Sequence, residues 1–257
     1  MQFFGDYHTH SRFSDGRQSV GDIINAARAR GLKEIAITDH GPLVAVIGVR
    51  DVSDYLKIKA ELATHPESEG IRLLIGAEAN IRDMHGTLDI PREIIEKLDL
   101  LIAGLHPYTL PTSLEDGMGV FVQNSLRHLG RYQRDKAIEH NTLAVLAAID
   151  QNPDLDIISH PGLFFALDIY EVGRACARND VLFEINCGHN FPDLSAIMEA
   201  DRAGASFIIN SDAHFEDSVG SLAYGEYVIE TLGIDKDRVA NYPGRGGYDT
   251  WGKRAKH

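Results

Sequence analysis

Seven short strand-like segments, separated by stretches with helical signals, constrain the fold of this chain more than any other feature of its sequence. Most of the segments are uniformly apolar, which is typical of parallel strands that helices cover. The predicted strands are an opening segment around residues 7–10 and segments at 34–38, 72–81, 98–106, 156–162, 181–186 and 206–210. Seven such units in 257 residues fit a closed or nearly closed α/β barrel better than an open sheet.

Helix signals fill the gaps between these strands. Ser19, followed three residues later by Asp22, predicts a helix start, and Gly31 predicts its end. Asp168 with Glu171 predicts the start of another helix. Further helices are expected at 51–64, 92–97, 141–151, 193–204 and 222–232.

Two regions depart from this alternation. Residues from about 107 to 134 are predicted to form a long polar connection, and a tail rich in glycine begins at about 242. Connections of that length are uncommon unless they cover a functional site. Neither region has the composition of a linker, so we predict a single domain over residues 1–257.

Composition restricts the partners. The 25 basic and 38 acidic side chains give a formal net charge of −13, which disfavours non-specific binding to nucleic acids or membrane surfaces. A small phosphorylated substrate remains compatible with this charge if metal ions provide local positive charge. The N-terminus lacks the features of a signal peptide, and no apolar run approaches membrane-spanning length. We therefore expect a cytoplasmic protein with no membrane partner.

Metal-ligand residues gather in a definite pattern. His8 and His10 are one residue apart on an extended segment, so their rings face the same side, and Asp15 follows within reach. Further residues of ligand type fall at the carboxyl ends of later predicted strands: His40, Glu78, His106, His160, Asp212 and His214. A single histidine at a strand end is more often a structural cap. Because the carboxyl ends of barrel strands meet at the active-site face, convergence of the whole set predicts a metal centre.

These nine side chains exceed the needs of one tetrahedral ion and suit two or three divalent ions. Mixed imidazole and carboxylate ligands accept Zn, Mn or Fe. Such a centre would bind phosphate and lower the pKa of a bound water, so we predict hydrolysis with a metal-bound hydroxide as nucleophile. No further catalytic residue is identified.

Several segments resemble the motifs of a known family. In chain order they are HTH at 8–10, TDHGP at 38–42, GAEANI at 76–81, AGLH at 103–106, ISHPG at 158–162, EIN at 184–186 and NSDAH at 210–214. Together they resemble the PHP (polymerase and histidinol phosphatase) family, especially its free-standing bacterial phosphatases with three metal ions. The resemblance implies a distorted seven-stranded (β/α) TIM-like barrel and phosphoesterase activity.

The resemblance also implies how the ligands are shared. One ion would be bound by His8, His10, Glu78 and Asp212. A second would take Glu78, His106 and His160, and a third would take Asp15, His40 and His214. The most similar subgroup carries a histidine near the position of Asp15, so the third site departs from that subgroup.

We therefore predict a metal-dependent phosphoesterase acting on a small phosphomonoester, with histidinol phosphate as one candidate among several. The alternative is a phosphodiesterase or exonuclease acting on nucleotides or single-stranded ends, which would need a basic, aromatic-lined groove. A non-catalytic metal-binding module would be marked by lost ligands, yet every position is filled. Nothing in the sequence selects an oligomeric state.

Four further residues are candidates for substrate contact. Arg12, Arg50 and Arg82 lie on connections that leave the carboxyl ends of strands, and a guanidinium group binds phosphate in a bidentate manner. His189 follows the sixth predicted strand and is placed to touch the substrate.

Overall fold

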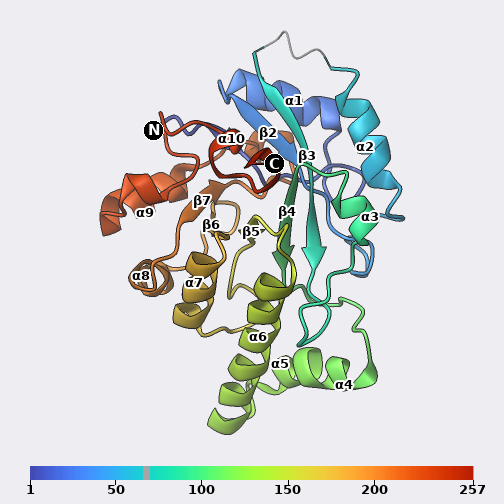
Figure 1. Cartoon of the computed structure of the whole chain (residues 1–257), viewed down its shortest axis with the longest axis vertical. Coiled ribbons are helices and arrows are strands. Elements are labelled where there is room, and N and C mark those ends of the chain that lie inside the picture. The colour runs from blue at the N-terminus through green and yellow to red at the C-terminus, as the bar shows by residue number, and fades with distance from the viewer. Residues whose placement is uncertain (66–69, 257) are drawn as a thin grey trace.

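The computed structural model describes residues 1–65 and 70–256. These residues form seven parallel strands whose order in the sheet is their order in the chain (Figure 1). The strands are β1 (Gly5–Asp6), β2 (Glu34–Ile37), β3 (Arg72–Asn80), β4 (Leu100–Gly104), β5 (Ile157–Ile158), β6 (Leu182–Asn186) and β7 (Phe207–Asn210).

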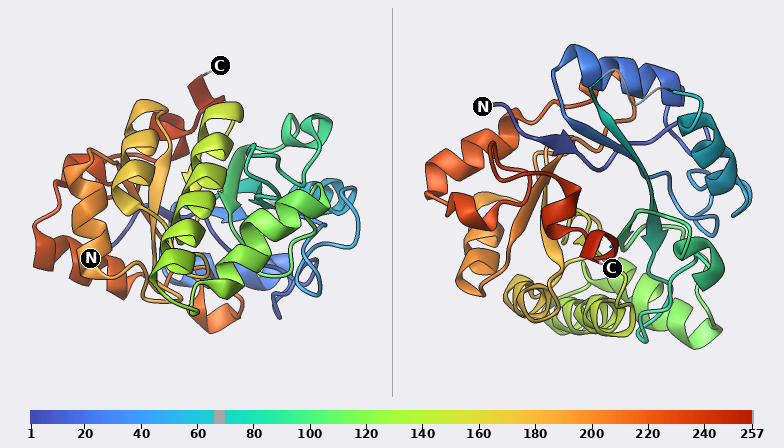
Figure 2. Two further views of the ribbon diagram at one scale, coloured as in Figure 1. Left: turned by 90° about the horizontal axis from the view of Figure 1, so that it is seen from below. Right: turned by 45° about the horizontal axis from the view of Figure 1, so that its top comes forward.

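The sheet curves into a nearly closed barrel. Beyond the ends of β1 and β7, Thr9 and Ala213 form a parallel bridge, and the His10 N–H donates to the Ala213 carbonyl at 2.9 Å. In the right-hand view of Figure 2, the strands form a ring with helices outside it. The predicted α/β, TIM-like barrel is confirmed.

The described helices are α1 (Val20–Ala29), α2 (Asp54–Leu62), α3 (Arg92–Ile95), α4 (Leu114–Asp116), α5 (Gln123–Leu126), α6 (Arg131–Gln151), α7 (Ile169–Arg178), α8 (Leu194–Arg202), α9 (Ala223–Leu232) and α10 (Tyr248–Trp251). Helices α1 to α8 lie between the strands in the chain, α9 follows β7, and the short α10 belongs to the tail inside the barrel. Within the described ranges, no helix combines the length and apolar character that crossing a membrane requires.

The predicted helix starts follow from local hydrogen bonds. The Ser19 hydroxyl accepts from the Asp22 N–H at 3.1 Å, and the Asp22 carboxylate accepts from the Ser19 N–H at 2.8 Å. Asp168 accepts from the Glu171 N–H at 3.1 Å in the same way. Both predicted caps are confirmed, because each satisfies an N–H group that would otherwise lack a partner.

The connection between β4 and β5 differs from the prediction. Most of residues 107–134 are helical, in α4, the π-helical turn η2 (Gly117–Val122), α5 and the first turn of α6. Helix α6 begins at Arg131, ten residues before the predicted start at Asn141. Its first turns are mostly exposed, so they need no apolar stripe that would reveal them in the sequence.

The C-terminal tail fills the barrel at the amino ends of the strands. The Tyr248 N–H donates to Glu34 at 2.7 Å, and Tyr248 and Trp251 contact through their ring edges with centroids 5.1 Å apart. Their neighbours inside the barrel are Tyr7, Ala36, Leu74, Leu100, Ile102, Ile157, Leu182 and Ile208. The tail crosses the centre of the ring in Figure 2, at the opposite mouth from the residues predicted to bind metal.

Candidate metal centre

All nine predicted ligands meet at the carboxyl mouth of the barrel. Strand β1 ends at Asp6, so His8 and His10 lie just beyond it instead of on it. Their rings nevertheless lie side by side, with centroids 5.0 Å apart. Asp15 lies in the loop between β1 and α1, and Glu78 lies two residues before the end of β3. The other ligands follow β2, β4, β5 and β7, as the sequence predicted.

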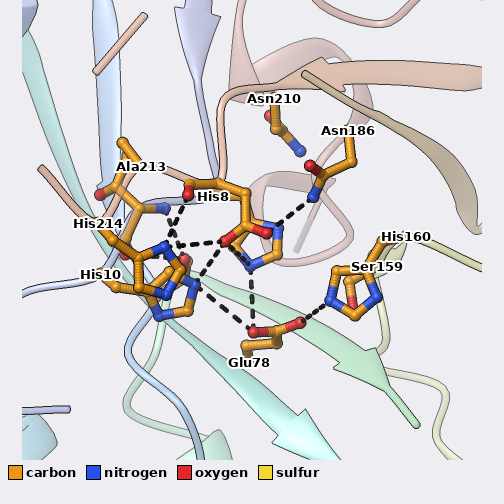
Figure 3. A network of polar contacts seen from close by, with 12 residues as sticks. His8, His10, Glu78, Ser159, His160, Asn186, Asn210, Ala213 and His214 are labelled. Carbon is orange, nitrogen blue, oxygen red and sulfur yellow. Dashed lines mark hydrogen bonds and ion pairs between the residues drawn. The ribbon is translucent and has the colours of Figure 1, made fainter. Parts of the chain in front are cut away.

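Glu78 lies at the centre of the cluster and is fully buried (Figure 3). Its Oε1 lies 3.1 Å from Nε2 of both His106 and His160. Its Oε2 lies 3.1 Å from His8 Nε2 and 2.9 Å from His40 Nδ1. His10 Nε2 lies 3.6 Å from the same Oε2, so one carboxylate faces five imidazoles and is placed to bind more than one cation.

The other two carboxylates complete the cluster on its cleft side. Asp212 Oδ1 lies 3.0 Å from His10 Nε2 and 3.6 Å from His8 Nε2. Asp15 Oδ2 lies 3.2 Å from His214 Nε2, and Asp15 Oδ1 lies 3.8 Å from His40 Nε2. Asp15 and His214 are half-buried, whereas Asp212 is buried.

Several of these buried atoms lack hydrogen-bond partners in the described chain, although charged neighbours lie close to them. They are His8 Nε2, both nitrogens of His10, His40 Nδ1, His106 Nδ1 and both carboxylate oxygens of Glu78. Each unsatisfied buried polar atom costs about 1–3 kcal/mol. Coordination of divalent cations would satisfy the two Glu78 oxygens and one nitrogen of each ring, so the residues fit metal ions.

Three sets of ligand atoms lie within 4.8 Å of one another: His10, Asp15, His40 and His214; His8, His10 and Glu78; and His40, Glu78 and His106. The first contains the trio expected to bind the third ion, with His10 added. The second contains three of the four residues expected for the first ion. The last set resembles the one expected for the second ion, with His40 in place of His160. His160 is nevertheless close to that set, because its Nε2 lies 3.3 Å from His106 Nε2.

The protonation states differ among the rings of the cluster. Burial, followed by repulsion from His40 and His214, lowers the pKa of His10 to about 3. Burial likewise lowers the pKa of His106 to about 4, against the attraction of Glu78. Burial raises the pKa of Glu78, but the nearby histidines outweigh it and hold that pKa well below its usual range. At neutral pH the rings of His10 and His106 are therefore neutral and Glu78 is ionised. Burial disfavours the charged forms of His8, His40 and His160 as well, but nearby carboxylates outweigh it and raise their pKa values, so a cation would compete with a proton at those rings.

Glu184 on β6 is a functional residue that the site prediction missed. Its Oε1 accepts from His8 Nδ1 at 2.7 Å and Asn210 Nδ2 at 2.9 Å. Its Oε2 accepts from the His160 N–H at 2.7 Å and Asn186 Nδ2 at 3.1 Å. With its Nδ1–H directed at Glu184, the neutral form of His8 would present the lone pair of Nε2 toward Glu78. A carboxylate within an apolar strand was the available signal.

Asp39 holds the loop that carries Asp15. It accepts from the Ser11 N–H at 2.8 Å, from the Ser11 hydroxyl at 2.6 Å and from the Ser14 hydroxyl.

The backbone is unusual just after two of the strands, where His160 and Asp212 have φ of 27° and 52°. Such strain persists where surrounding contacts fix the backbone, and it gathers at functional sites.

The cluster faces a cleft of about 540 Å³. His189 lines this cleft, with Nε2 3.5 Å from Asp212 Oδ2. Arg12, Arg50 and Arg82 are not among its lining residues. Arg12 Nε donates to the Arg17 carbonyl of its own loop at 3.1 Å. Arg82 Nε donates to the Leu110 carbonyl of the connection after β4 at 2.9 Å.

The comparisons with known proteins agree with this geometry. The PHP domain family model matches residues 6–181. The chain is 31% identical over 252 residues to a "Probable phosphatase" of Thermoanaerobacter sp. (strain X514), which covers 94% of this chain and 91% of the relative. It is 28% identical to a "Probable phosphatase" of Shewanella frigidimarina, with 94% and 90% covered.

A similar fold occurs in the crystal structure of histidinol phosphate phosphatase from Lactococcus lactis, complexed with zinc, L-histidinol and phosphate. The two structures superpose with a TM-score of 0.57 at 17% identity, covering 91% of this chain and 95% of the other. By its family model and its relatives, this chain belongs to the PHP domain family.

Proposed function

We propose that the protein is a metal-dependent phosphatase that hydrolyses a small phosphomonoester. The observation that carries this proposal is the buried set of unpartnered imidazole and carboxylate atoms at the floor of an open cleft. The names of the relatives in its family, and the phosphate ester that gives the structural neighbour its name, support the same reaction class.

The nine clustered side chains would hold two or three divalent ions, with Zn, Mn and Fe all compatible with the donors. Such ions supply Lewis acidity for a phosphoryl oxygen and acidify water at neutral pH. The protein's contribution is to fix the donor atoms. Both oxygens of Glu78 face imidazole nitrogens and would serve as metal ligands, and the contact with Glu184 would orient the neutral ring of His8 so that Nε2 can bind a cation.

A small monoester fits the cleft better than a polynucleotide. The lining residues in the described part of the chain include no lysine or arginine. Binding of single-stranded nucleic acid depends on a basic groove with stacking aromatic side chains. Without cations along the cleft, the phosphate would be held by the metal ions alone, so a substrate with one phosphate at its end is favoured.

The test combines metal analysis with a panel of phosphomonoesters and phosphodiesters. His8→Ala and Asp212→Ala should each lower kcat/KM for monoesters more than about 100-fold and reduce the bound metal, because each removes a donor. His128→Ala is the matched control, since His128 is exposed and outside the cluster. Full activity in both cluster variants, with metal content unchanged, would overturn the proposal.

A further inference from the structure

The cleft above the metal centre has an apolar wall. Its lining includes Ala45, Ile47, Pro107, Tyr108, Phe164 and Phe215. Tyr108, Phe215 and Phe164 are 80%, 52% and 37% exposed, although large apolar side chains gain free energy when buried. An exposed apolar group of this kind at the mouth of a site is typical of a ligand-binding surface.

Phe164 stands next to the cluster itself. Its ring centroid lies 5.8 Å from that of His160 and 6.2 Å from that of His189. On the other side of the cleft, the Arg17 guanidinium lies 5.9 Å from the centroid of the Phe215 ring. A group attached to a phosphate at the metal centre would therefore meet aromatic rings at once.

Two loops beside this wall are bonded to each other, and each contains a residue with a strained backbone conformation. Val44 and Thr109 form an antiparallel bridge, and the Ala45 N–H donates to the Tyr108 carbonyl at 3.2 Å. Tyr108 has φ of 66°, and Val46, at the tip of the facing loop, has φ of 77°. A positive φ is a clear outlier for a β-branched residue, and strain of this kind is typical of ligand clamps.

Charge is missing from the same wall. The carboxylates among the described lining residues are Asp15 and Asp212, and both face histidines of the cluster. The described lining residues include no lysine or arginine, and the Arg17 guanidinium beside the wall lies over the Phe215 ring, so a charged leaving group would meet mainly rings and aliphatic carbon. The wall suits an uncharged, apolar group.

We infer that the leaving group of the physiological phosphomonoester is uncharged and aromatic or otherwise apolar, and that it packs against Tyr108, Phe164 and Phe215. This inference rests on the proposed phosphatase function and narrows it to a substrate class. Because the metal centre binds every phosphate alike, the wall would select the substrate through the alcohol portion.

The experiment uses four esters that share the same ethyl phosphate core and differ only at carbon 2: phenyl, hydroxyl, ammonium and carboxylate. Their leaving alcohols have similar reactivity, so differences in kcat/KM report contacts with the wall. The metal-loaded protein should prefer 2-phenylethyl phosphate to 2-hydroxyethyl phosphate by about tenfold or more, chiefly through KM. The charged esters should be poorer still.

Substitutions locate the preference. Phe164→Ala should shrink the phenyl-to-hydroxyl ratio several-fold, and Phe164→Leu should restore much of it, because leucine keeps an apolar surface. Tyr227→Ala is the matched control, since Tyr227 is 53% exposed on α9 and does not line the cleft. Equal kcat/KM for the phenyl and hydroxyl esters, or a ratio that survives Phe164→Ala, would overturn the inference while leaving the phosphatase function intact.

A binding measurement separates this inference from the proposed reaction. Calorimetry on the metal-loaded protein should give a dissociation constant about tenfold lower for 3-phenylpropylphosphonate than for 3-hydroxypropylphosphonate. If none of the four esters is hydrolysed, the proposed function fails, and this phosphonate pair alone decides the inference. Equal constants for the pair would overturn it.

Discussion

Replacing Glu184 with glutamine tests how the metal centre is built. Glu184 is fully buried and accepts four hydrogen bonds, two on each oxygen. Two of these bonds fix His8 and His160, which both face Glu78. Glu184→Gln keeps the size and shape of the side chain but turns one acceptor oxygen into a donor.

The expected loss of stability follows from the buried N–H donors that lose their acceptor in the variant. If the glutamine oxygen stays on His8 and Asn210, its amide group faces the His160 N–H and the Asn186 amide. Asn186 keeps its bond to Asp212 Oδ2 at 3.0 Å, so the loss falls mainly on the His160 N–H and on the new amide group. At about 1–3 kcal/mol for each buried unsatisfied group, the free energy of unfolding should fall by about 4 kcal/mol.

Urea unfolding of the metal-free proteins at pH 7 measures this loss, with the fluorescence of Trp251, the single tryptophan, as the signal. Metal affinity, measured by competition with a chelator, should fall about 10- to 100-fold because His8 loses its orienting partner. Glu171→Gln is the control, since its ion pair with Arg174 is exposed and contributes little. Unfolding within about 1 kcal/mol of the wild type, with unchanged metal affinity, would refute the reasoning.

Two further predictions concern the opposite mouth of the barrel. Tyr248→Ala should lower the free energy of unfolding by about 3–5 kcal/mol, because it removes a buried ring. Tyr248→Phe should lose only the hydrogen bond from the hydroxyl to the Asp99 carbonyl, which contributes about 1 kcal/mol. A large fall in kcat/KM in a variant that stays folded would contradict a purely structural role for Tyr248. Burial raises the pKa of Asp156 to about 6, against bonds from the Lys253 and Leu101 N–H groups, so the folded state holds this proton more tightly than the unfolded chain. The free energy of unfolding should therefore fall as pH rises from about 4 to about 6, by up to roughly 3 kcal/mol. In the Asp156→Asn variant, urea unfolding should give a free energy that changes less over this pH range. The same pH dependence in both proteins would contradict the prediction.

The barrel could be predicted because parallel strands buried on both faces need apolar side chains throughout. Strand lengths were less visible, since β1 and β5 each have only two residues. The chain at His160 turns away with a positive φ soon after β5, which strand composition does not reveal. The early start of α6 was hidden because an exposed helix carries no apolar stripe.

The sequence predicts which residues lie near the site, but not the direction in which each side chain points. Ligands at the carboxyl ends of parallel strands converge, since the fold brings those ends together. Sequence position does not say where a long side chain turns, so it could not show that Arg82 bonds to the carbonyls of Leu110 and Pro111. It also could not separate a carboxylate that faces the cleft, such as Asp212, from one that holds a histidine, such as Glu184.

The carboxylates behind the cluster explain how the ligand positions can be fixed before any cation binds. Glu184 holds His8 and the backbone of His160, Asp39 holds Ser11 in the loop that leads to Asp15, and Asp6 accepts from Ser211 and from the Gly220 N–H. These bonds hold strained and unpartnered groups together at the carboxyl mouth, while packing at the amino mouth stabilises the barrel as a whole. Bound ions would then add stability that grows with the logarithm of their affinity, without having to order the site. The two mouths of the barrel therefore differ in role. The proposed chemistry takes place at the carboxyl mouth, where polar atoms remain unsatisfied, and the tail stabilises the fold at the amino mouth by packing against the apolar core.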